Sequence, residues 1–251
     1  MGSLRTALAS GQTVFGTWLS LTDSVGAELL GQAGFDYLIL DCQHGGPAAG
    51  DLSRLLQAVE LGGTRAFVRV PWPDPAQIMR ALDLGAIGVV VPMVSSAEVA
   101  EQVGRATKFP PLGERSYGPV RRNADDWSQG LAQGLCLAMI ETRAGLEQLD
   151  AIAAAPGVDG LFLGPMDLAL DLGYPPSLEL PEEVLAAIAR LVECCKRHGK
   201  FAGCAGYNPQ SVEQLVGLGV QVLTVGSDMG FLRRGAQAAV EQMRALKGAN
   251  G

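Results

Sequence analysis

The sequence predicts a single α/β domain folded as a closed (β/α)8 barrel. Three observations support this prediction: the length of 251 residues, eight short apolar segments, and longer segments of helical period that alternate with them. Most of the apolar segments are continuous rather than alternating, as expected for parallel strands that are buried on both faces. Eight such units in this length favour a closed barrel, and a doubly wound open sheet is the alternative.

The candidate strands are runs of four or five residues rich in apolar and β-branched side chains. In chain order they are Val14–Trp18, Tyr37–Asp41, Ala66–Arg69, Gly88–Val91, Cys136–Ile140, Gly160–Leu163, Phe201–Cys204 and Gln221–Val225. The stretches between them are long enough for the crossover connections that a parallel sheet requires.

Six of these stretches contain segments that are predicted to be crossover helices. They are Ser24–Gly34, Asp51–Leu61, Pro75–Leu84, Ser95–Lys108, Pro181–His198 and Asn208–Leu218. Many of them end at a glycine, which tolerates the left-handed backbone of a helix cap. These glycines are Gly34, Gly62, Gly85, Gly199 and Gly219. Segment 108–130, rich in Pro, Gly and Arg, is too long for an ordinary connection, and no structure is predicted for it.

The composition argues against several classes of protein. Hydrophobic residues make up 48% of the chain, but no apolar run reaches the roughly 18 to 20 residues of a membrane span, and no leader sequence is predicted. A formal charge of −7 with scattered basic residues argues against a nucleic-acid surface. The odd number of cysteines and the lack of zinc spacing argue against disulfides and structural zinc, and favour a reducing, cytoplasmic location. The cysteines are Cys42, Cys136, Cys194, Cys195 and Cys204.

The carboxyl ends of the predicted strands carry the candidate functional residues, because chemistry in such barrels collects on the loops that follow the strands. These positions are Trp18, Asp41 to Gly46, Arg69, Glu141, Gly164 to Asp167, Gly206, Tyr207 and Gly226 to Asp228. Polar side chains are therefore expected to converge on one rim of the barrel.

Two carboxylates on this rim predict a metal site. Glu141 and Asp167 stand just past two consecutive strands, and neighbouring strands lie about 4.8 Å apart. Two anions held this close share a proton or bind a cation, and Arg143 is the only obvious basic residue near them in the sequence. Oxygen ligands, few of them from protein, favour a hard and partly hydrated ion such as Mg²⁺ or Mn²⁺.

His44 is the predicted proton carrier. The other histidine, His198, ends a predicted helix, where an imidazole complements the helix dipole. His44 lies in a Gly-rich loop at the rim, where an imidazole can move protons near neutral pH. The alternative is that His44 only ties its loop to a backbone carbonyl.

Arg69 ends the third predicted strand, and its guanidinium fork can hold a carboxylate or a developing enolate oxygen. The alternative for Arg69 is a structural pair with a neighbouring barrel carboxylate.

Asp83 is either a solvated helix residue or a partner that orients His44, and spacing alone favours the former. No lysine is predicted inside the barrel, which argues against Schiff-base catalysis. The lysines are Lys108, Lys196, Lys200 and Lys247.

Six sequence fragments, in order along most of the chain, form a specific pattern. They are Gly16-Thr-Trp18-Leu, Ala33-Gly-Phe-Asp-Tyr37 leading to Asp41-x-x-His44, Val68-Arg69-Val-Pro71, Ala81-Leu-Asp83-x-Gly85-Ala86, Ile140-Glu141-Thr142 and Phe162-x-Gly164-Pro165-x-Asp167-Leu168. Together they resemble the class II, metal-dependent pyruvate aldolases of the 4-hydroxy-2-oxoheptanedioate aldolase family and the related 2-keto-3-deoxy sugar acid aldolases.

The resemblance implies a TIM barrel of the phosphoenolpyruvate/pyruvate type that catalyses aldol addition and retro-aldol cleavage between pyruvate, or hydroxypyruvate, and an aldehyde. Glu141 and Asp167 match the family's ligands for Mg²⁺, Mn²⁺ or Co²⁺. Arg69 matches the arginine that binds the donor and stabilises its enolate, and His44 with Asp83 matches a dyad that works through water as general base and acid. The other matched positions, which bind substrate or support the site, are Trp18, Gly164, Pro165, Met166, Asp41 and Gln43.

The resemblance also implies a hexamer with an exchanged C-terminal helix, so the segment at about 230–247 is a candidate for packing on another subunit. Its apolar stripe is Leu232, Ala236, Val240 and Met243. Two positions depart from the family pattern, which often has an acidic residue in place of Gln43 and a glutamine in place of Met139. Both departures remove polar groups, and we expect them to alter donor or acceptor preference rather than abolish activity.

Three other functions stay open. Oxaloacetate decarboxylation would use the same enolate, and a barrel without catalysis would bind a small acid as a regulator or scaffold. A phosphosugar isomerase is suggested by Gly206, Gly226 and Ser227 at the usual phosphate corner of a barrel. Asp228, however, would repel a phosphate there.

Overall fold

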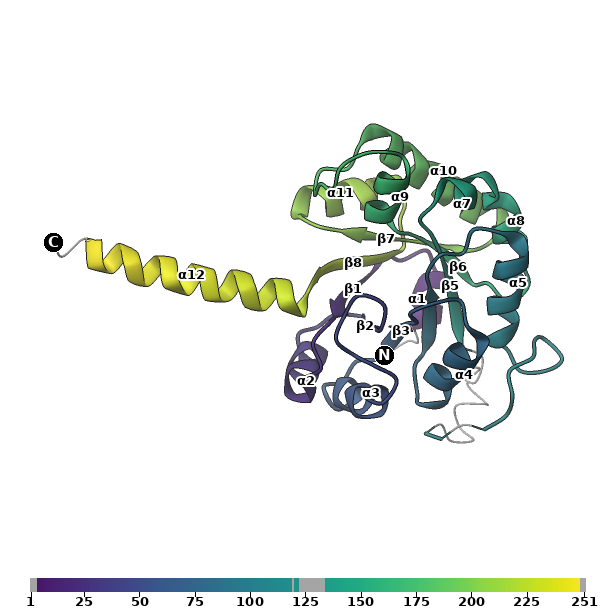
Figure 1. The fold of residues 1–251 in the computed structure, drawn as a ribbon, viewed down its shortest axis with the longest axis horizontal. Helices are drawn as coiled ribbons and strands as arrows, with labels where there is room; N and C mark the ends of the chain where they lie inside the picture. The colour runs from purple at the N-terminus through teal and green to yellow at the C-terminus, as the bar shows by residue number, and fades with distance from the viewer. Residues whose placement is uncertain (1–3, 119, 122–133, 249–251) are drawn as a thin grey trace.

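A computed structural model describes residues 4–118, 120–121 and 134–248, and it confirms the predicted closed barrel. Eight parallel strands pair in chain order, and the last pairs with the first (Figure 1). The strands are β1 Val14–Leu19, β2 Tyr37–Asp41, β3 Ala66–Arg69, β4 Gly88–Val91, β5 Leu135–Ile140, β6 Gly160–Leu163, β7 Phe201–Gly206 and β8 Val222–Ser227. The open doubly wound sheet is therefore excluded.

Several strands extend further than the sequence indicates, mainly at their carboxyl ends. β1 runs to Leu19, β7 to Gly206 and β8 to Ser227. Leu19 pairs with Leu40 of β2, and Gly206 pairs with Val225 of β8. Ser227 pairs because the barrel closes: it stands opposite Trp18 of β1, past a shift in the register of the two strands. The longer strands carry their last side chains toward the rim that the sequence predicts to be functional.

The six predicted helices all form, with ends that differ from the predicted ones by at most a few residues. They are α2 Ser24–Gln32, α3 Leu52–Leu61, α4 Pro75–Asp83, α5 Ala97–Ala106, α10 Glu182–His198 and α11 Pro209–Leu218. Side-chain oxygens of Asp23, Asp74, Ser96 and Asn208 cap the amino ends of four of them. Gly199 and Gly219 form the expected left-handed caps, but Gly62 does not, because the left-handed residue there is Gly63.

Within the described ranges, four short helices were not predicted, because none is longer than seven residues and their apolar period is too brief to recognise. They are α1 Leu4–Ala9, α7 Arg143–Glu147, α8 Leu149–Ala154 and α9 Pro165–Asp171. The last one matters for function, because it makes Asp167 a residue of a first helical turn rather than of a loop. Pro165 occupies the start of that helix, where its fixed backbone angle is favourable.

Segment 108–130 lies partly outside the described residues. Its described part, 108–118 with 120–121, contains no helix or strand. Lys108 is buried and pairs with Asp159 at 2.6 Å, so it fills a structural role. Arg115 is also buried and binds Asp83, with an Nη2 to Oδ1 distance of 2.7 Å. Residues 119 and 122–130 of this segment lie outside the described residues.

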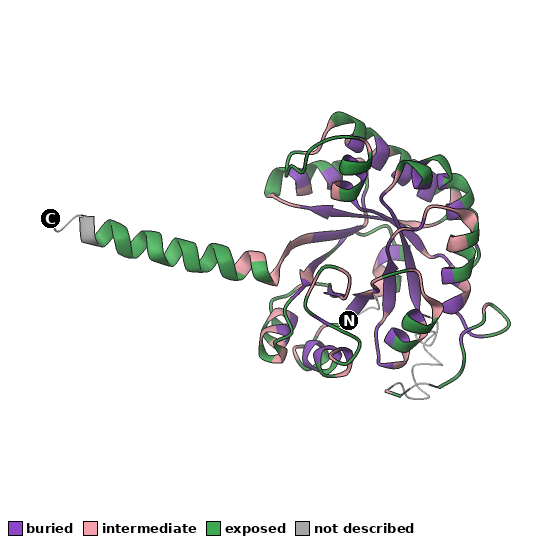
Figure 2. Ribbon diagram, in the orientation of Figure 1, coloured by how far each residue is buried: buried purple, intermediate pink, exposed green. Residues whose placement is uncertain are grey.

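The core has two layers. Figure 2 shows that the strands are largely buried and that buried residues on many of the surrounding helices alternate with exposed ones. A larger layer fills the space between the strands and the outer helices. A smaller layer fills the barrel itself, where Tyr37, Phe67, Leu137 and Phe162 pack against one another. This inner layer makes the barrel a packed core rather than a pore, so a ligand site can form only where the packing stops at one end.

The last helix, α12 Asp228–Gly248, stands away from the barrel and exposes nearly all of its length (Figures 1 and 2). Its predicted stripe is open to solvent, with Leu232 and Met243 each 66% exposed. Phe231, near its start, stacks on Phe35 of the barrel with ring centroids 6.2 Å apart.

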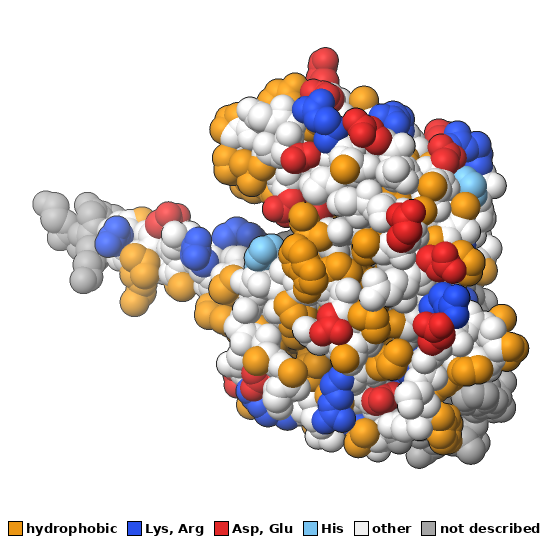
Figure 3. Space-filling view, turned by 45° about the vertical axis from the view of Figure 1, so that its right-hand side comes forward, with side chains coloured by type: hydrophobic (Ala, Val, Ile, Leu, Met, Phe, Trp, Pro, Cys, Tyr) orange, Lys and Arg blue, Asp and Glu red, His pale blue; other side chains and the backbone are white. Residues whose placement is uncertain are grey.

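No helix among the described residues is both long and apolar enough to span a membrane. On one face of the molecule, acidic and basic side chains are interspersed (Figure 3).

Candidate active site

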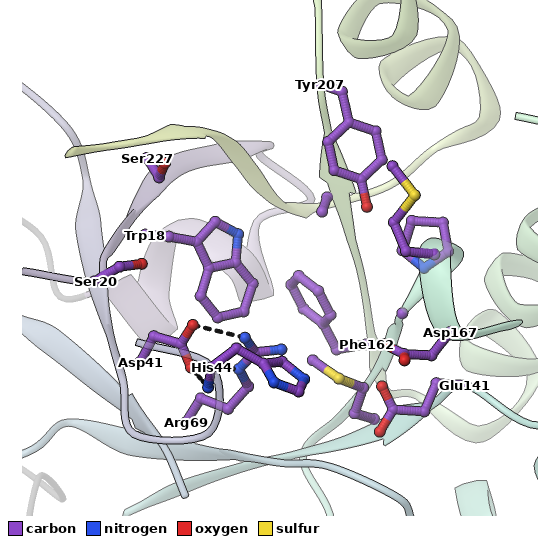
Figure 4. A pocket seen from close by; sticks show the side chains of 15 residues that line it. Trp18, Ser20, Asp41, His44, Arg69, Glu141, Phe162, Asp167, Tyr207 and Ser227 are labelled. Atoms are coloured by element: carbon purple, nitrogen blue, oxygen red, sulfur yellow. Dashed lines mark hydrogen bonds and ion pairs between the residues drawn. The ribbon is translucent and has the colours of Figure 1, made fainter. Parts of the chain in front are cut away.

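A cavity of about 240 Å³ opens at the carboxyl ends of the strands, where the inner layer stops. Nearly all the candidate site residues named from the sequence lie in its wall (Figure 4). The lining residues are Trp18, Ser20, Asp41, His44, Arg69, Met139, Glu141, Phe162, Gly164, Pro165, Met166, Asp167, Ala205, Tyr207 and Ser227. The structure thus brings together groups that are up to about two hundred residues apart in the chain.

Arg69 is held in one orientation by two neighbours. It stands opposite Asp41 in the β2–β3 register, and its Nε and Nη2 atoms donate to the two Asp41 oxygens at 2.9 and 2.7 Å. The guanidinium carbon lies 4.4 Å from the centre of the Trp18 ring. The structural pair considered for Arg69 is therefore present, and it fixes the guanidinium at the cavity wall (Figure 4).

Asp41 is ionised, and it holds both the Arg69 side chain and the loop that carries His44. Burial raises its pKa, but the Arg69 guanidinium and the backbone N–H groups of His44 and Gln43 outweigh burial and hold the pKa below its usual range. Its Oδ1 accepts both N–H groups at 3.1 Å. One carboxylate therefore orients Arg69 and shapes the loop that carries His44.

His44 is exposed, and its imidazole is directed into the cavity (Figure 4). Among the described residues, its ring forms no hydrogen bond, and the loop is held instead by the backbone N–H groups that donate to Asp41. The alternative in which the imidazole ties the loop to a carbonyl is therefore not what the structure shows. The ring is available to a ligand.

Glu141 lies on the opposite wall and is only 2% exposed. Its Oε1 accepts the backbone N–H of Met93 at 2.6 Å, whereas its buried Oε2 has no hydrogen-bond partner. Burial, with a smaller contribution from the Asp167 charge, raises the pKa of Glu141 to about 7, although the Met93 N–H and Arg69 oppose the shift. A buried carboxylate oxygen without a partner is costly unless something else binds it.

The backbone around Glu141 is built to leave room for that oxygen. Met93 has a positive φ of 55°, which is uncommon for a residue other than glycine and presents its N–H to the carboxylate. A Cβ atom at Gly164 would lie 2.7 Å from Oε2, so only glycine fits there. Both features leave a buried carboxylate oxygen without a hydrogen-bond partner beside the cavity.

Glu141 and Asp167 fit a divalent cation. Asp167, in the first turn of α9, lines the same cavity, and its charge acts on Glu141. Within the described part of the chain, neither carboxylate forms an ion pair with a basic side chain. Two oxygen donors from protein suit a hard ion that keeps positions for water and substrate.

Asp83 does not reach this cavity. It ends α4, where its carboxylate binds Arg115, and it is not among the lining residues. The physical reason is direction: crossover helices run antiparallel to the strands, so the end of α4 lies at the amino ends of the strands, away from the site. The pairing of Asp83 with His44 that the resemblance implies is therefore not formed within the chain, and Asp41 is the carboxylate next to His44.

The structure adds lining residues that the sequence did not single out. Phe162 packs edge-on to Trp18, with ring centroids 6.1 Å apart, and its inward position follows from strand alternation. Tyr207, named only as a rim residue, places its phenol in the wall, where burial raises its pKa and keeps it neutral. Met139 lines the cavity, whereas Gln43 does not, and the buried Oε1 of Gln43 has no hydrogen-bond partner.

The corner at which many barrels bind phosphate is occupied by a carboxylate. Asp228 accepts the backbone N–H groups of Ser20 at 3.0 Å, Leu21 at 2.8 Å and Met229 at 2.7 Å. These are donors that a phosphate would need. This arrangement argues against the phosphosugar isomerase.

The raised pKa of Glu141 predicts a stability effect in metal-free protein. A folded-state pKa of about 7 against an ordinary 4.5 means that folding is penalised once the carboxyl ionises, so the penalty is absent below about 4.5 and complete above about 7. Glu141→Gln should increase the free energy of unfolding by on the order of 2 to 3 kcal/mol at about pH 8 and by less than about 1 kcal/mol at about pH 5. Urea unfolding in chelator measures both values.

Glu147→Gln is the matched control, because Glu147 is exposed on α7. It should leave stability unchanged at both pH values. If Glu141→Gln changed the free energy of unfolding equally at the two pH values, the buried position would not carry an ionisable carboxyl with a raised pKa.

The fold and the cavity define a (β/α)8 barrel with a polar site at its carboxyl rim, and similarity to known proteins identifies its family. The sequence profile of the HpcH/HpaI aldolase/citrate lyase family matches residues 14–235, and the chain belongs to that family. It is 37% identical to a hydroxypyruvate/pyruvate aldolase of Rhizorhabdus wittichii over 98% of this chain and 100% of that protein. It is also 37% identical to a 4-hydroxy-2-oxo-heptane-1,7-dioate aldolase of Escherichia coli, over 94% of this chain and 92% of that protein.

Solved structures agree with this assignment. The crystal structure of an HpcH/HpaI aldolase/citrate lyase family protein from Burkholderia cenocepacia superposes with a TM-score of 0.87 at 31% identity, covering 97% of this chain and 100% of that one. An HpcH/HpaI aldolase from Desulfitobacterium hafniense gives a TM-score of 0.87 at 30% identity, covering 96% of each chain. The family resemblance inferred from the six sequence fragments is confirmed.

Proposed function

We propose that this protein is a metal-dependent aldolase that joins a 2-oxoacid donor, pyruvate or hydroxypyruvate, to an aldehyde and also catalyses the reverse cleavage. The observation that carries the proposal is the buried, unpartnered Oε2 of Glu141 in the same cavity as the Arg69 guanidinium and the His44 imidazole. The names of the two relatives support the reaction and the donor class.

Glu141 and Asp167 are the proposed ligands for a divalent cation, Mg²⁺, Mn²⁺ or Co²⁺. When bound, such an ion acts as a Lewis acid that lowers the cost of removing a proton next to the donor ketone. The two carboxylates orient the ion, and the backbone of Met166 and Asp167, in the first turn of α9, is the proposed position for the donor carboxylate.

Arg69 is proposed to hold the oxygen that becomes negative as the donor loses its proton. Two of the five N–H donors of a guanidinium go to Asp41, which leaves three for substrate. The Trp18 ring and the Asp41 carboxylate prevent the side chain from turning away. Such pre-positioned donors stabilise developing charge without reorganisation during the reaction.

His44 is proposed to take the proton from the donor C3 carbon, directly or through a water, and later to protonate the new alkoxide. Its ring is free of hydrogen bonds to the described residues and faces the cavity. Asp41 holds the backbone of His44 rather than its ring, so Asp41 acts by fixing the loop. Asp83 has no proposed role in this chain's own cavity.

Proton exchange on pyruvate tests the function. With Mn²⁺ in deuterated buffer, the wild-type protein should exchange the methyl protons of pyruvate, because it forms the carbanion without any aldehyde. His44→Ala should slow this exchange by about 10² to 10⁴-fold, the usual contribution of a general base, while still binding Mn²⁺. Nuclear magnetic resonance follows the exchange.

A barrel that only binds a small acid would give no exchange in the wild-type protein. Unchanged exchange in His44→Ala would reject His44 as the base. Oxaloacetate as an added substrate would show whether decarboxylation accompanies the aldol reaction.

The exposed stripe of α12 supports a homo-oligomer, which we propose to be a hexamer built by exchange of this helix between single-domain subunits. Glutamate substitutions at both Val240 and Met243, which are 48% and 66% exposed, should release smaller species, because charge cannot be buried in an apolar interface. Light scattering after gel filtration measures the mass. Gln242→Glu, on another face of the helix, is the control and should not change it, and an unchanged mass in the double variant would contradict the proposal.

The proposed location is the cytoplasm. All five cysteines are free thiols in the structure, in agreement with a reducing compartment.

A further inference from the structure

A second cluster of potential metal ligands lies in the outer ring of helices, away from the cavity. Cys194 and His198 are four residues apart on α10 and therefore share one face of the helix. Asp150, from the neighbouring helix α8, meets both of them. Among the described residues, this is the only group of three or more histidine, cysteine or acidic side chains whose ligand atoms all lie within 4.8 Å of one another.

The spacing of the ligand atoms already resembles a tetrahedral site. The Sγ of Cys194 lies 3.6 Å from Oδ1 of Asp150, and Nε2 of His198 lies 3.1 Å from the same oxygen. Zinc bonds of about 2.3 Å to sulfur and about 2.0 Å to nitrogen or oxygen place the corresponding atoms about 3.5 and 3.3 Å apart in a tetrahedron. The two observed distances are close to these values, and the third, from Sγ of Cys194 to Nε2 of His198, is no longer than 4.8 Å.

Without an ion, the Cys194 proton and the Arg197 guanidinium both interact with the proposed ligand atoms. The Cys194 thiol is close enough to donate to the carbonyl of Leu149 at 3.7 Å as well as to Asp150, and burial raises its pKa, so it carries its proton. The Arg197 guanidinium binds Oδ1 of Asp150 at 2.5 Å. An ion must therefore displace one proton, which leaves to solvent as the sulfur–metal bond forms, and must compete with one guanidinium.

We propose that Asp150, Cys194 and His198 form a second metal site that takes a thiophilic divalent ion of the Zn²⁺ class, with water as the remaining ligand. The combination of thiolate, imidazole and carboxylate selects such an ion over Mg²⁺ or Mn²⁺. The site differs in chemistry from the pair Glu141 and Asp167, which offers oxygen alone. The chain then binds one hard ion at the cavity and one thiophilic ion between α8 and α10.

Cobalt is the probe, because a cobalt–thiolate bond absorbs in the near ultraviolet and a site made of oxygen ligands does not. Chelator-treated, reduced protein titrated with Co²⁺ should develop a charge-transfer band, and added Zn²⁺ should remove it. Cys194→Ser should abolish the band, and His198→Gln should weaken Co²⁺ binding at the site. Cys195→Ala is the matched control and should keep the band, because Cys195 is directed to the Phe201 carbonyl instead.

Arg197→Gln provides a gain-of-binding test that damage to the fold cannot imitate. It should lower the Co²⁺ concentration at half-saturation by roughly two- to fivefold, the range expected when one exposed ion pair stops competing. The absence of a thiolate band in the wild-type protein would overturn the proposal, as would a band that survives Cys194→Ser. Unchanged Co²⁺ binding in Asp150→Asn would overturn Asp150 as a ligand. None of these results depends on aldolase activity, so the function proposed above stands or fails separately.

Discussion

Asp167→Ala is expected to abolish metal-dependent aldol turnover, with kcat/KM lowered by at least about 10³-fold. The substitution removes one of the two carboxylates that line the cavity opposite Arg69 and leaves Glu141 as the only carboxylate on that wall. Loss of several kcal/mol of charge stabilisation by an ion corresponds to this factor, since about 1.4 kcal/mol is tenfold in rate. Retro-aldol rates with Mn²⁺ and with chelator, together with Mn²⁺ binding, measure the effect.

Asp171→Ala is the matched control for this experiment. Asp171 lies on the same short helix, but its carboxylate accepts the backbone N–H of Arg143 at 2.6 Å and does not line the cavity. Its turnover should stay within a few-fold of the wild type. If Asp167→Ala kept the full rate in chelator, the assignment of the metal site would be wrong.

Arg69→Lys is expected to lower kcat/KM by about 10² to 10³-fold, the loss typical when one pre-positioned donor to a developing oxyanion is removed. Lysine keeps the positive charge but has no planar fork, so it cannot bind both oxygens of Asp41, lie flat on Trp18 and still face the substrate. The effect therefore isolates geometry from charge. Steady-state kinetics with a saturating concentration of metal measures it.

The control is Arg65→Lys, because Arg65 is exposed just before β3, at the opposite end of the same strand. It should leave the kinetics unchanged. A thermal midpoint should be recorded for both variants, since Asp41 loses its partner in Arg69→Lys. Wild-type kinetics in a folded Arg69→Lys protein would show that the fork does not act on the substrate.

The barrel was predictable because its evidence is local: each strand is a short apolar run, and eight runs in 251 residues leave few alternatives. Strand ends were less predictable, because a last residue such as Leu19, Gly206 or Ser227 joins a strand only through its partner on a neighbouring strand, and the partners are Leu40, Val225 and Trp18. The helix α9 was missed because its seven residues are too few to show a helical period.

The candidate site was predictable where it depended on strand order. Glu141 and Arg69 follow or end strands, so their rim positions followed from the fold. Asp83 ends a crossover helix that runs antiparallel to the strands, so the fold puts it at their amino ends, where its carboxylate binds Arg115 rather than His44. The positive φ of Met93 could not be predicted, because methionine gives no signal for a left-handed backbone.

The cluster of Asp150, Cys194 and His198 could not be predicted from the sequence either. The spacing of Cys194 and His198 is visible in the sequence, but Asp150 joins them only through the packing of α8 on α10. Spacing rules for zinc sites detect ligands that are close in sequence and overlook such a third ligand.

A crystal structure of the protein with Mn²⁺ and pyruvate tests the central claim most directly. We expect anomalous density for one ion in contact with both Glu141 and Asp167, with pyruvate between that ion and the Arg69 guanidinium and with its methyl group toward His44. Density for the ion elsewhere, with these two carboxylates unoccupied, would contradict the account.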